Sequence, residues 1–175
     1  ISDIAHQELQ GICTANIKNE IGKCTYTHML NSDGGIETDL TVVCLDKNHF
    51  RLISSAATRE RDKFHIKKHL SNEIKIKDVS DNFCVFGLFG PKSRDLIKMI
   101  SKDDFENENL KFGTGKNILI EGVKVWAQRL SYVGELGFEL YIEFKDTKKI
   151  YELIVDAGKN FNLSNCGMHA MDIMR

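Results

Sequence analysis

The order of the predicted elements indicates an α+β fold with antiparallel or mixed sheets and packed helices. Strand patterns occur in pairs joined by short turns, and helical patterns stand between the pairs. Short turns favour antiparallel pairing, whereas parallel βαβ units need a helix after each strand. With 175 residues and no internal repeat or low-complexity linker, the chain suits one sizeable domain or two small ones.

The first half of the chain predicts helix, hairpin, helix. The expected elements are a helix at 3–17, strands at 38–45 and 50–54 joined by a turn at 46–49, and a helix at 59–70. Thr58 precedes the charged second helix and is a suitable N-cap residue. We expect the apolar side of that helix to carry Phe64, Ile66 and Leu70.

The second half predicts strands and helices in a mixed order. They are strands at 74–79 and 83–89, a helix at 93–100, a hairpin of 117–121 and 123–130, a strand at 138–144 and a helix at 147–160. Residues 74–79 alternate between apolar and polar side chains, as a half-buried strand does. Gly90-Pro91 ends one strand and Gly122 turns the hairpin.

Composition excludes several classes of protein. The 24 basic and 25 acidic residues leave a net charge of -1, so there is no electrostatic case for binding nucleic acid or an anionic membrane. No apolar run reaches the length of about 18 residues that a membrane span requires. The chain starts at Ile1 without a methionine and stops at Arg175, so we expect a fragment of a longer protein. Its expected location is the cytoplasm, or the mitochondrial matrix in a eukaryote.

The cysteines and histidines do not predict a metal site. The five cysteines are odd in number and form no CxxC pair, so we expect reduced thiols that serve as small apolar residues. His65 and His69 have the i, i+4 spacing of helical metal ligands. They stand among lysines and arginines, which favours a solvated helix face.

The first segment that can carry chemistry runs from Tyr26 to Asp39. Asn31 to Gly35 is a turn signal, and its two glycines permit positive φ or a close backbone approach. Asp39 stands at the start of the next strand. It is either a solvated carboxylate after a hairpin loop, or an anchor or acid–base group in a cleft.

The second segment runs from Ser131 to Glu139. Phe138 and Leu140 face one side of a strand, so Glu139 faces the other, towards either solvent or a pocket. A glutamate can accept paired N–H bonds from the ring nitrogen and the exocyclic amine of a 2-amino-4-oxo pyrimidine edge. Tyr132 can add a hydrogen bond or ring packing.

These segments resemble the glycine-cleavage T-protein (aminomethyltransferase) family. The resemblance covers nearly the whole chain in order, through YTHMLNSDGGIETDLTV, SSAATRERD, FGLFGPKSRDLI, RLSYVGELGFELYI and CGMHAMDIMR. FGTGK at 112–116 and YVGELGFELYI are most similar to the folate-binding region of the dimethylglycine and sarcosine dehydrogenases. The resemblance implies the aminomethyltransferase folate-binding fold across residues 1–175, without its C-terminal barrel.

The resemblance also implies tetrahydrofolate binding and one-carbon transfer. By its match to the family, Asp39 supports methylene transfer beside the reactive folate nitrogens, and Tyr26 lines the folate pocket. Tyr132 and Glu139 hold the pterin, and Arg175 matches a family arginine. Met171 replaces another arginine of the T-protein, and Ser55 replaces an asparagine.

Three functions remain open at this stage. The leading one is the folate-binding region of a flavin-dependent dimethylglycine or sarcosine dehydrogenase, in which a flavin domain ahead of this chain would bind FAD. The second is a stand-alone T-protein, whose partner would be a lipoyl carrier protein. The third is a folate-binding module without catalytic turnover.

Overall fold

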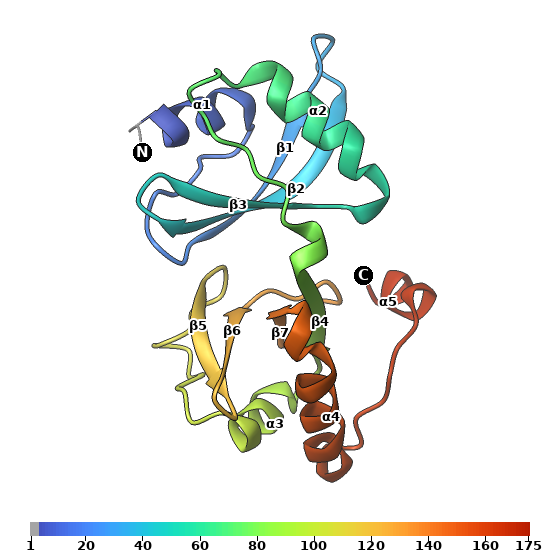
Figure 1. Ribbon diagram of the computed structural model, residues 1–175. Coiled ribbons are helices and arrows are strands. Elements are labelled where there is room, and N and C mark those ends of the chain that lie inside the picture. The colour runs from blue at the N-terminus through green and yellow to red at the C-terminus, as the bar shows by residue number, and fades with distance from the viewer. Residues whose placement is uncertain (1–3) are drawn as a thin grey trace. The chain divides into compact units, whose positions relative to one another are not determined.

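The computed structural model describes residues 4–175 and divides the chain into two compact units. Unit 1 ends at Asp78 and unit 2 begins at Val79. Each unit has its own antiparallel sheet and its own helices (Figure 1). The predicted α+β class is therefore confirmed, and the region that the sequence presents as one is built from two units.

Unit 1 is a three-stranded sheet in the order β1-β2-β3, covered on one face by two helices. Its elements are α1 (Ile4–Ile12), β1 (Cys24–Leu30), β2 (Ile36–Asp46), β3 (His49–Ser54), the 3-10 turn η1 (Ala56–Thr58) and α2 (Arg59–His69). The core between sheet and helices consists of Leu9, Cys13, Ile17, Met29, Leu40, Val42 and Ile66. Because strand side chains alternate, Tyr26 and His28 on β1 and Asp39 and Thr41 on β2 face away from this core.

The predicted β2–β3 hairpin is confirmed, but α1 is shorter than expected. It ends at Ile12, and position 3 lies outside the described residues. The chain then leaves the helix to join β1, because the Thr14 N–H donates to the carbonyl of His28 over 3.0 Å. The side chain of Gln10 bonds the backbone of Ala15 and Ile17, which provides this turn with the partners that further helix would have supplied.

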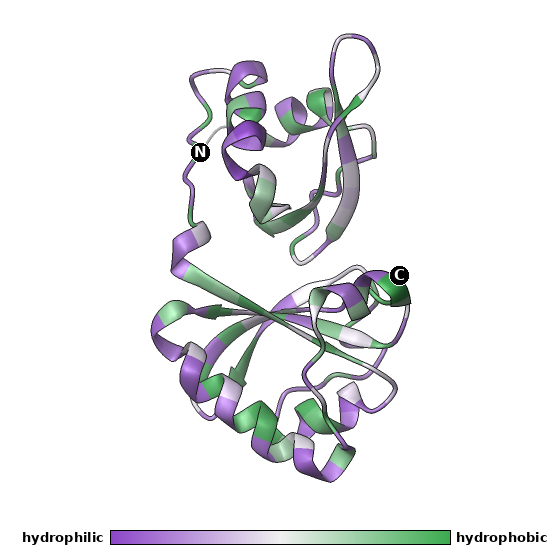
Figure 2. Cartoon of the chain, turned by 90° about the vertical axis from the view of Figure 1, so that its right-hand side faces the viewer, coloured by the Kyte–Doolittle hydropathy of each residue, from purple (hydrophilic) through white to green (hydrophobic). Residues whose placement is uncertain are grey.

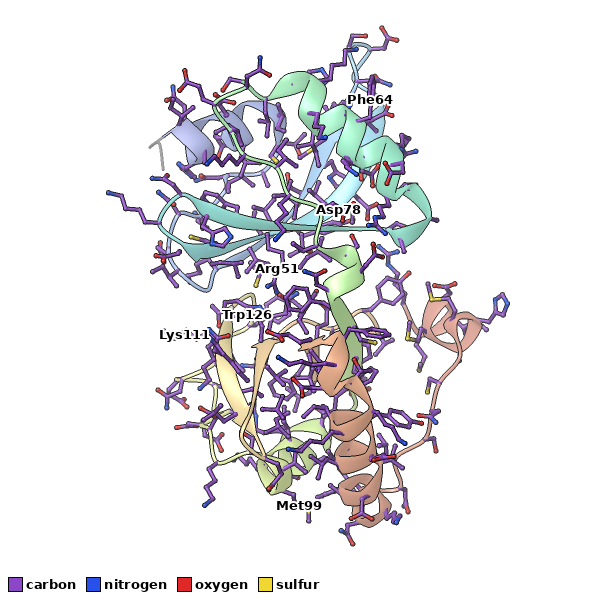
Figure 3. All side chains as sticks on the ribbon, in the orientation of Figure 1. Arg51, Phe64, Asp78, Met99, Lys111 and Trp126 are labelled. Carbon is purple, nitrogen blue, oxygen red and sulfur yellow. The ribbon has the colours of Figure 1, made fainter. Side chains whose placement is uncertain are left out.

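Two further predictions for unit 1 are wrong. Phe64 does not share the buried side of α2 with Ile66, since its side chain is 69% exposed (Figure 3). Asp62 and Ile66, one turn apart, face the core instead. Residues 74–79 form no strand, and the Asp78 carboxylate is held by Arg59 on α2 at 2.9 Å. Alternating polarity alone does not supply a strand with a pairing partner.

Unit 2 is a four-stranded sheet in the order β4-β7-β6-β5. Its elements are the 3-10 turn η2 (Ser80–Asn82), β4 (Phe83–Phe89), α3 (Ser93–Ile100), β5 (Gly115–Ile120), β6 (Val123–Gln128), β7 (Gly137–Glu143), η3 (Phe144–Asp146), α4 (Thr147–Gly158), η4 (Lys159–Phe161) and α5 (Met168–Met174). Helices α3 and α4 cover one face of the sheet, and their apolar sides meet the strands in the core (Figure 2). The structure confirms the expected strands at 83–89 and 138–144, the hairpin around Gly122 and both helices. Most of their ends lie within one or two residues of the predicted ends.

One strand and one α-helix of the described residues were not predicted. Strand β1 pairs with β2 along its whole length, so the expected hairpin is part of a three-stranded sheet. Helix α5 follows an extended Gly167 near the end of unit 2. Among residues 4–175, no helix has both the length and the apolar character needed to cross a membrane.

Candidate functional site

The turn before Asp39 is built by one asparagine. The side-chain oxygen of Asn31 accepts the N–H groups of Asp33, at 3.1 Å, and Gly35, at 2.9 Å. Gly34 has φ of 80°, which glycine adopts without a steric penalty. The predicted Asn31–Gly35 turn is thus confirmed, and it leads directly into β2.

Tyr26 and Asp39 form a hydrogen-bonded pair on the sheet face that points away from the core of unit 1. The Tyr26 hydroxyl donates to Oδ2 of Asp39 over 3.0 Å. Both side chains are exposed. The ring of His28 lies edge-on to that of Tyr26, with 5.3 Å between the ring centroids. The pairing follows from strand register, because Asp39 lies opposite His28 and Tyr26 is two residues from His28 on β1. This arrangement gives an accessible carboxylate whose orientation is restrained by a phenol.

A second carboxylate secures the strand that carries Asp39. Asp62 on α2 is 2% exposed, and it accepts hydrogen bonds from Thr58 at 2.6 Å and from Arg61 at 3.1 Å. Burial acts to raise its pKa, but the hydrogen bonds from Thr58, Ser54, Arg61 and Thr38 outweigh burial and lower the pKa overall. Thr38 is the neighbour of Asp39, so Asp62 ties the start of β2 to the helix behind it.

Glu139 lies in unit 2, on the sheet face opposite α3 and α4. Its Oε2 accepts from the side-chain amide of Gln128 at 2.8 Å and from the hydroxyl of Tyr141 at 2.9 Å. Gln128 is fully buried and stands directly opposite Glu139 across the β6–β7 ladder. Glu139 itself is half-buried. The sequence interpretation of a carboxylate that faces away from Phe138 and Leu140 is therefore confirmed.

Tyr132 is joined to α5. Its hydroxyl donates to Asp172 over 3.1 Å and accepts from Nη1 of Arg175 over 3.1 Å. The guanidinium of Arg175 also lies 4.7 Å from the centre of the Tyr132 ring, within cation–π range. The C-terminal segment thus contributes a carboxylate and a guanidinium around one phenol.

The predicted site residues fall into three groups. Tyr26 pairs with Asp39 in unit 1, Tyr132 pairs with Arg175 in unit 2, and Glu139 bonds residues of β6 and β7. Sequence reasoning missed three polar partners, namely Gln128, Tyr141 and Asp172. The i, i+2 spacing of Tyr141 and Glu139 was a usable signal, whereas Gln128 depends on strand register and Asp172 on the unpredicted α5.

Comparison with protein families and individual proteins gives consistent matches. The family model described as "GCVT N-terminal domain" matches residues 3–175. An aminomethyltransferase of Natranaerobius thermophilus is 33% identical over 88% of this chain and 42% of its own length. Human mitochondrial dimethylglycine dehydrogenase is 30% identical over 92% of this chain and 19% of its own length. The chain therefore spans less than half the length of these relatives.

A solved structure supports the fold assignment. The glycine cleavage system aminomethyltransferase T of Bartonella henselae superimposes with a TM-score of 0.71 at 20% identity. The match covers 87% of this chain and 40% of that structure. At this level of identity the likeness bears on the fold, which agrees with the expected aminomethyltransferase folate-binding fold.

Proposed function

Since the chain belongs to the GCVT N-terminal domain family, we propose that it binds tetrahydrofolate and takes part in one-carbon transfer. Bound tetrahydrofolate supplies the nitrogens that accept the one-carbon unit. The observation that carries the proposal is the exposed Asp39 carboxylate held by Tyr26. The sequence resemblance matches this residue to an aspartate of the family. The residues of this chain would bind the folate, orient it and manage its protons.

In this proposal Asp39 is the catalytic residue. A carboxylate next to a reacting amine can accept or return its proton, and such groups contribute typically about 10²–10⁴-fold to a rate. The hydroxyl of Tyr26 restrains one oxygen, so that the other is presented in a defined direction. Restraint of this kind lowers the entropy that is lost when the reacting groups meet.

Glu139, Tyr132 and Arg175 would bind the folate in unit 2. The donor set fits a pterin, since the carboxylate of Glu139 accepts hydrogen bonds and the ring offers N–H donors. Tyr132 offers an aromatic face, and Arg175 offers a cation for the negative charges of a folate. Met171 lies on α5, two residues after the exposed His169, and provides no guanidinium.

Binding is tested by calorimetric titration of the 175-residue chain with tetrahydrofolate. We expect heat of binding for the wild type and an affinity at least about ten-fold lower for Glu139→Ala, because a charge-assisted hydrogen bond is lost. Glu135→Ala, an exposed carboxylate in the same segment, is the matched control. An absence of heat with the wild type contradicts folate binding by this chain, and equal affinities contradict the role of Glu139.

Catalysis is tested in the full-length protein with Asp39→Ala, for which we expect methylene transfer to fall by about 100-fold or more. Asp33→Asn, in the exposed turn, is the control and should retain activity. Undiminished transfer by Asp39→Ala removes this residue from the mechanism. A loss in both variants points to a general defect of unit 1.

The source of the one-carbon unit separates two forms of the proposal. The leading form is a folate-binding region of a flavin-dependent dimethylglycine or sarcosine dehydrogenase, and Met171 favours it over a T-protein. The second form is an aminomethyltransferase with a lipoyl carrier protein as donor, and the 33% identity to such a protein favours it. FAD belongs only to the first form, in a flavin domain outside this chain. A GxGxxG fingerprint in the gene upstream of Ile1 would favour the first form, and transfer from an aminomethylated lipoyl carrier the second.

A further inference from the structure

Four side chains of the unit 2 sheet form a directed chain of hydrogen bonds that ends at Glu139. Trp126 and Gln128 stand two residues apart on β6, and Glu139 and Tyr141 stand two residues apart on β7. The two pairs lie opposite each other in register. All four therefore project from the face that α3 and α4 leave uncovered. Figure 3 marks Trp126, the single tryptophan of the chain, on β6.

The direction of the chain follows from its first member. An indole N–H can only donate, so the atom of Gln128 that meets it at 3.3 Å must be the amide oxygen. The amide nitrogen of Gln128 then points the other way and donates to Glu139 and, at 3.1 Å, to the hydroxyl of Tyr141. Having accepted from Gln128, Tyr141 gives its one proton to Glu139.

The consequence is a carboxylate that meets only donors. Two hydrogen bonds arrive at Oε2 of Glu139, while Oε1 accepts none from residues 4–175. Two hydrogen bonds to one oxygen hold the rotamer of the side chain, and a carboxylate can only accept. A ligand that approaches Glu139 must therefore supply N–H or O–H donors, because a ligand acceptor would face a carboxylate with no proton to offer.

Glycines make room for aromatic rings on both sides of this chain. A Cβ at Gly115, opposite Gln128, would lie 2.7 Å from the indole of Trp126. A Cβ at Gly87 or Gly137 would lie 2.5 Å or 2.3 Å from the ring of Phe89. Gly87 stands directly opposite Glu139 on β4, and Gly137 precedes it by two residues on β7. Flat rings on both sides suit a planar ligand, and Gly115 gives the FGTGK segment a physical role.

We propose that Trp126, Gln128 and Tyr141 are positioning residues that hold Glu139 as an acceptor-only carboxylate, so that this face selects a planar ligand bearing N–H donors. The inference rests on the proposed function for the identity of that ligand, tetrahydrofolate. Its own content is the dependence of selection on residues behind Glu139.

The first test measures selection rather than affinity alone. The affinity of the chain for tetrahydrofolate is compared with that for its 2-desamino analogue, which lacks one donor. We expect the wild type to prefer tetrahydrofolate by about ten-fold or more, and Gln128→Met and Tyr141→Phe to lose most of that preference. Asn117→Ala, at an exposed position on neighbouring β5, is the matched control and should keep it. If these residues had a purely structural role, the variants would bind both ligands more weakly by the same factor and would keep the preference. That result would overturn the inference.

A folate-free test separates this inference from the proposed function. The chain has one tryptophan, so a proton–nitrogen correlation spectrum contains one indole signal, that of Trp126. We expect Glu139→Gln to move this signal in the wild type but not in a Gln128→Met background, since Gln128 carries the coupling. An equal displacement in both backgrounds overturns the inference. If the wild type binds no folate while this coupling is found, the proposed function fails and the hydrogen-bond chain stands.

Discussion

Asp62 connects three elements of unit 1 through hydrogen bonds to its buried carboxylate. It is almost fully buried, and its hydrogen bonds join α2 to the start of β2 and the end of β3. We expect Asp62→Asn to lower the free energy of unfolding by about 2 kcal/mol at pH 7, because charge-assisted hydrogen bonds are lost. Asp33→Asn, in the exposed turn, should change it by less than about 0.5 kcal/mol.

The pH dependence of this contribution has a defined sign. The pKa of Asp62 is lowered in the folded state, so its contribution is present above the unfolded value, about 3.9, and is lost as the pH falls through the folded value. The free energies of unfolding of the wild type and of Asp62→Asn, measured by denaturation between pH 7 and pH 2, should therefore converge in acid. A constant difference across that range would contradict the assignment.

The cysteines differ in reactivity according to burial. Burial raises the pKa of the Cys13 thiol to about 11, although a hydrogen bond from Thr27 acts in the opposite direction. At pH 8 its thiolate fraction is then about one in a thousand, and the side chain is 7% exposed. Cys166 is exposed and should be alkylated by iodoacetamide well before the buried Cys13. Alkylation followed by mass spectrometry should show no fast phase in Cys166→Ser. Early modification of Cys13 would contradict the expectation.

At the scale of elements, the β5–β6 hairpin offers a pair of substitutions with opposite signs. Glu121 and Gly122 join the strands with φ of 45° and 79°, the pattern of a type I′ turn. Gly122→Ala should cost about 1 kcal/mol, while Glu121→Asn should stabilise by about 0.5 kcal/mol because asparagine tolerates positive φ. Lys149 bonds the backbone carbonyl of Glu121 and is retained in both variants. If chemical denaturation showed that both variants change the free energy of unfolding in the same direction, the conformation of this turn would not explain their effects.

Elements were predictable where local signals and burial agreed. The Gly122 hairpin and the apolar strand at 83–89 have clear turn residues and a continuous apolar pattern, and both were located correctly. Residues 74–79 alternate as well as any strand, yet nothing in a sequence pattern supplies the partner that a ladder needs. Helix α5 has only seven residues, fewer than the window of about 11–18 residues in which a helical period can be recognised.

The candidate site was predictable to a similar degree. Asp39 and Glu139 were candidates from their places after a glycine turn and on the polar side of a strand, and the family resemblance selected them over a solvated interpretation. Their partners were harder to find, since Gln128 meets Glu139 only through the register of β6 and β7. A polar residue at the end of an otherwise apolar strand has an ordinary solvated interpretation until register places it opposite a carboxylate. Residue types thus indicated the candidate residues, and pairing in the sheets supplied their hydrogen-bond partners.

At the scale of the whole molecule, the two units have separate hydrophobic cores. The core of unit 1 joins α1, α2 and the β1–β3 sheet, and that of unit 2 joins α3, α4 and the β4–β7 sheet, with no residue in common. A domain with its own core is expected to fold alone. We therefore expect residues 79–175, produced separately, to unfold cooperatively and to keep the near-ultraviolet circular dichroism of Trp126.

Substitutions make this expectation specific to each unit. Gly122→Ala should lower the stability of the 79–175 piece by about the same 1 kcal/mol as in the whole chain, because its turn contacts lie within unit 2. Asp62→Asn should lower the free energy of unfolding of residues 1–78 by about the same amount as in the whole chain. Unfolding of this piece is measured by far-ultraviolet circular dichroism, because Trp126 is absent from it. A 79–175 piece without a cooperative transition or tryptophan signal would mean that its core is insufficient alone. Because Gln128, Glu139 and Tyr141 all belong to unit 2, a folded 79–175 piece should also retain the hydrogen-bond chain and its single indole resonance.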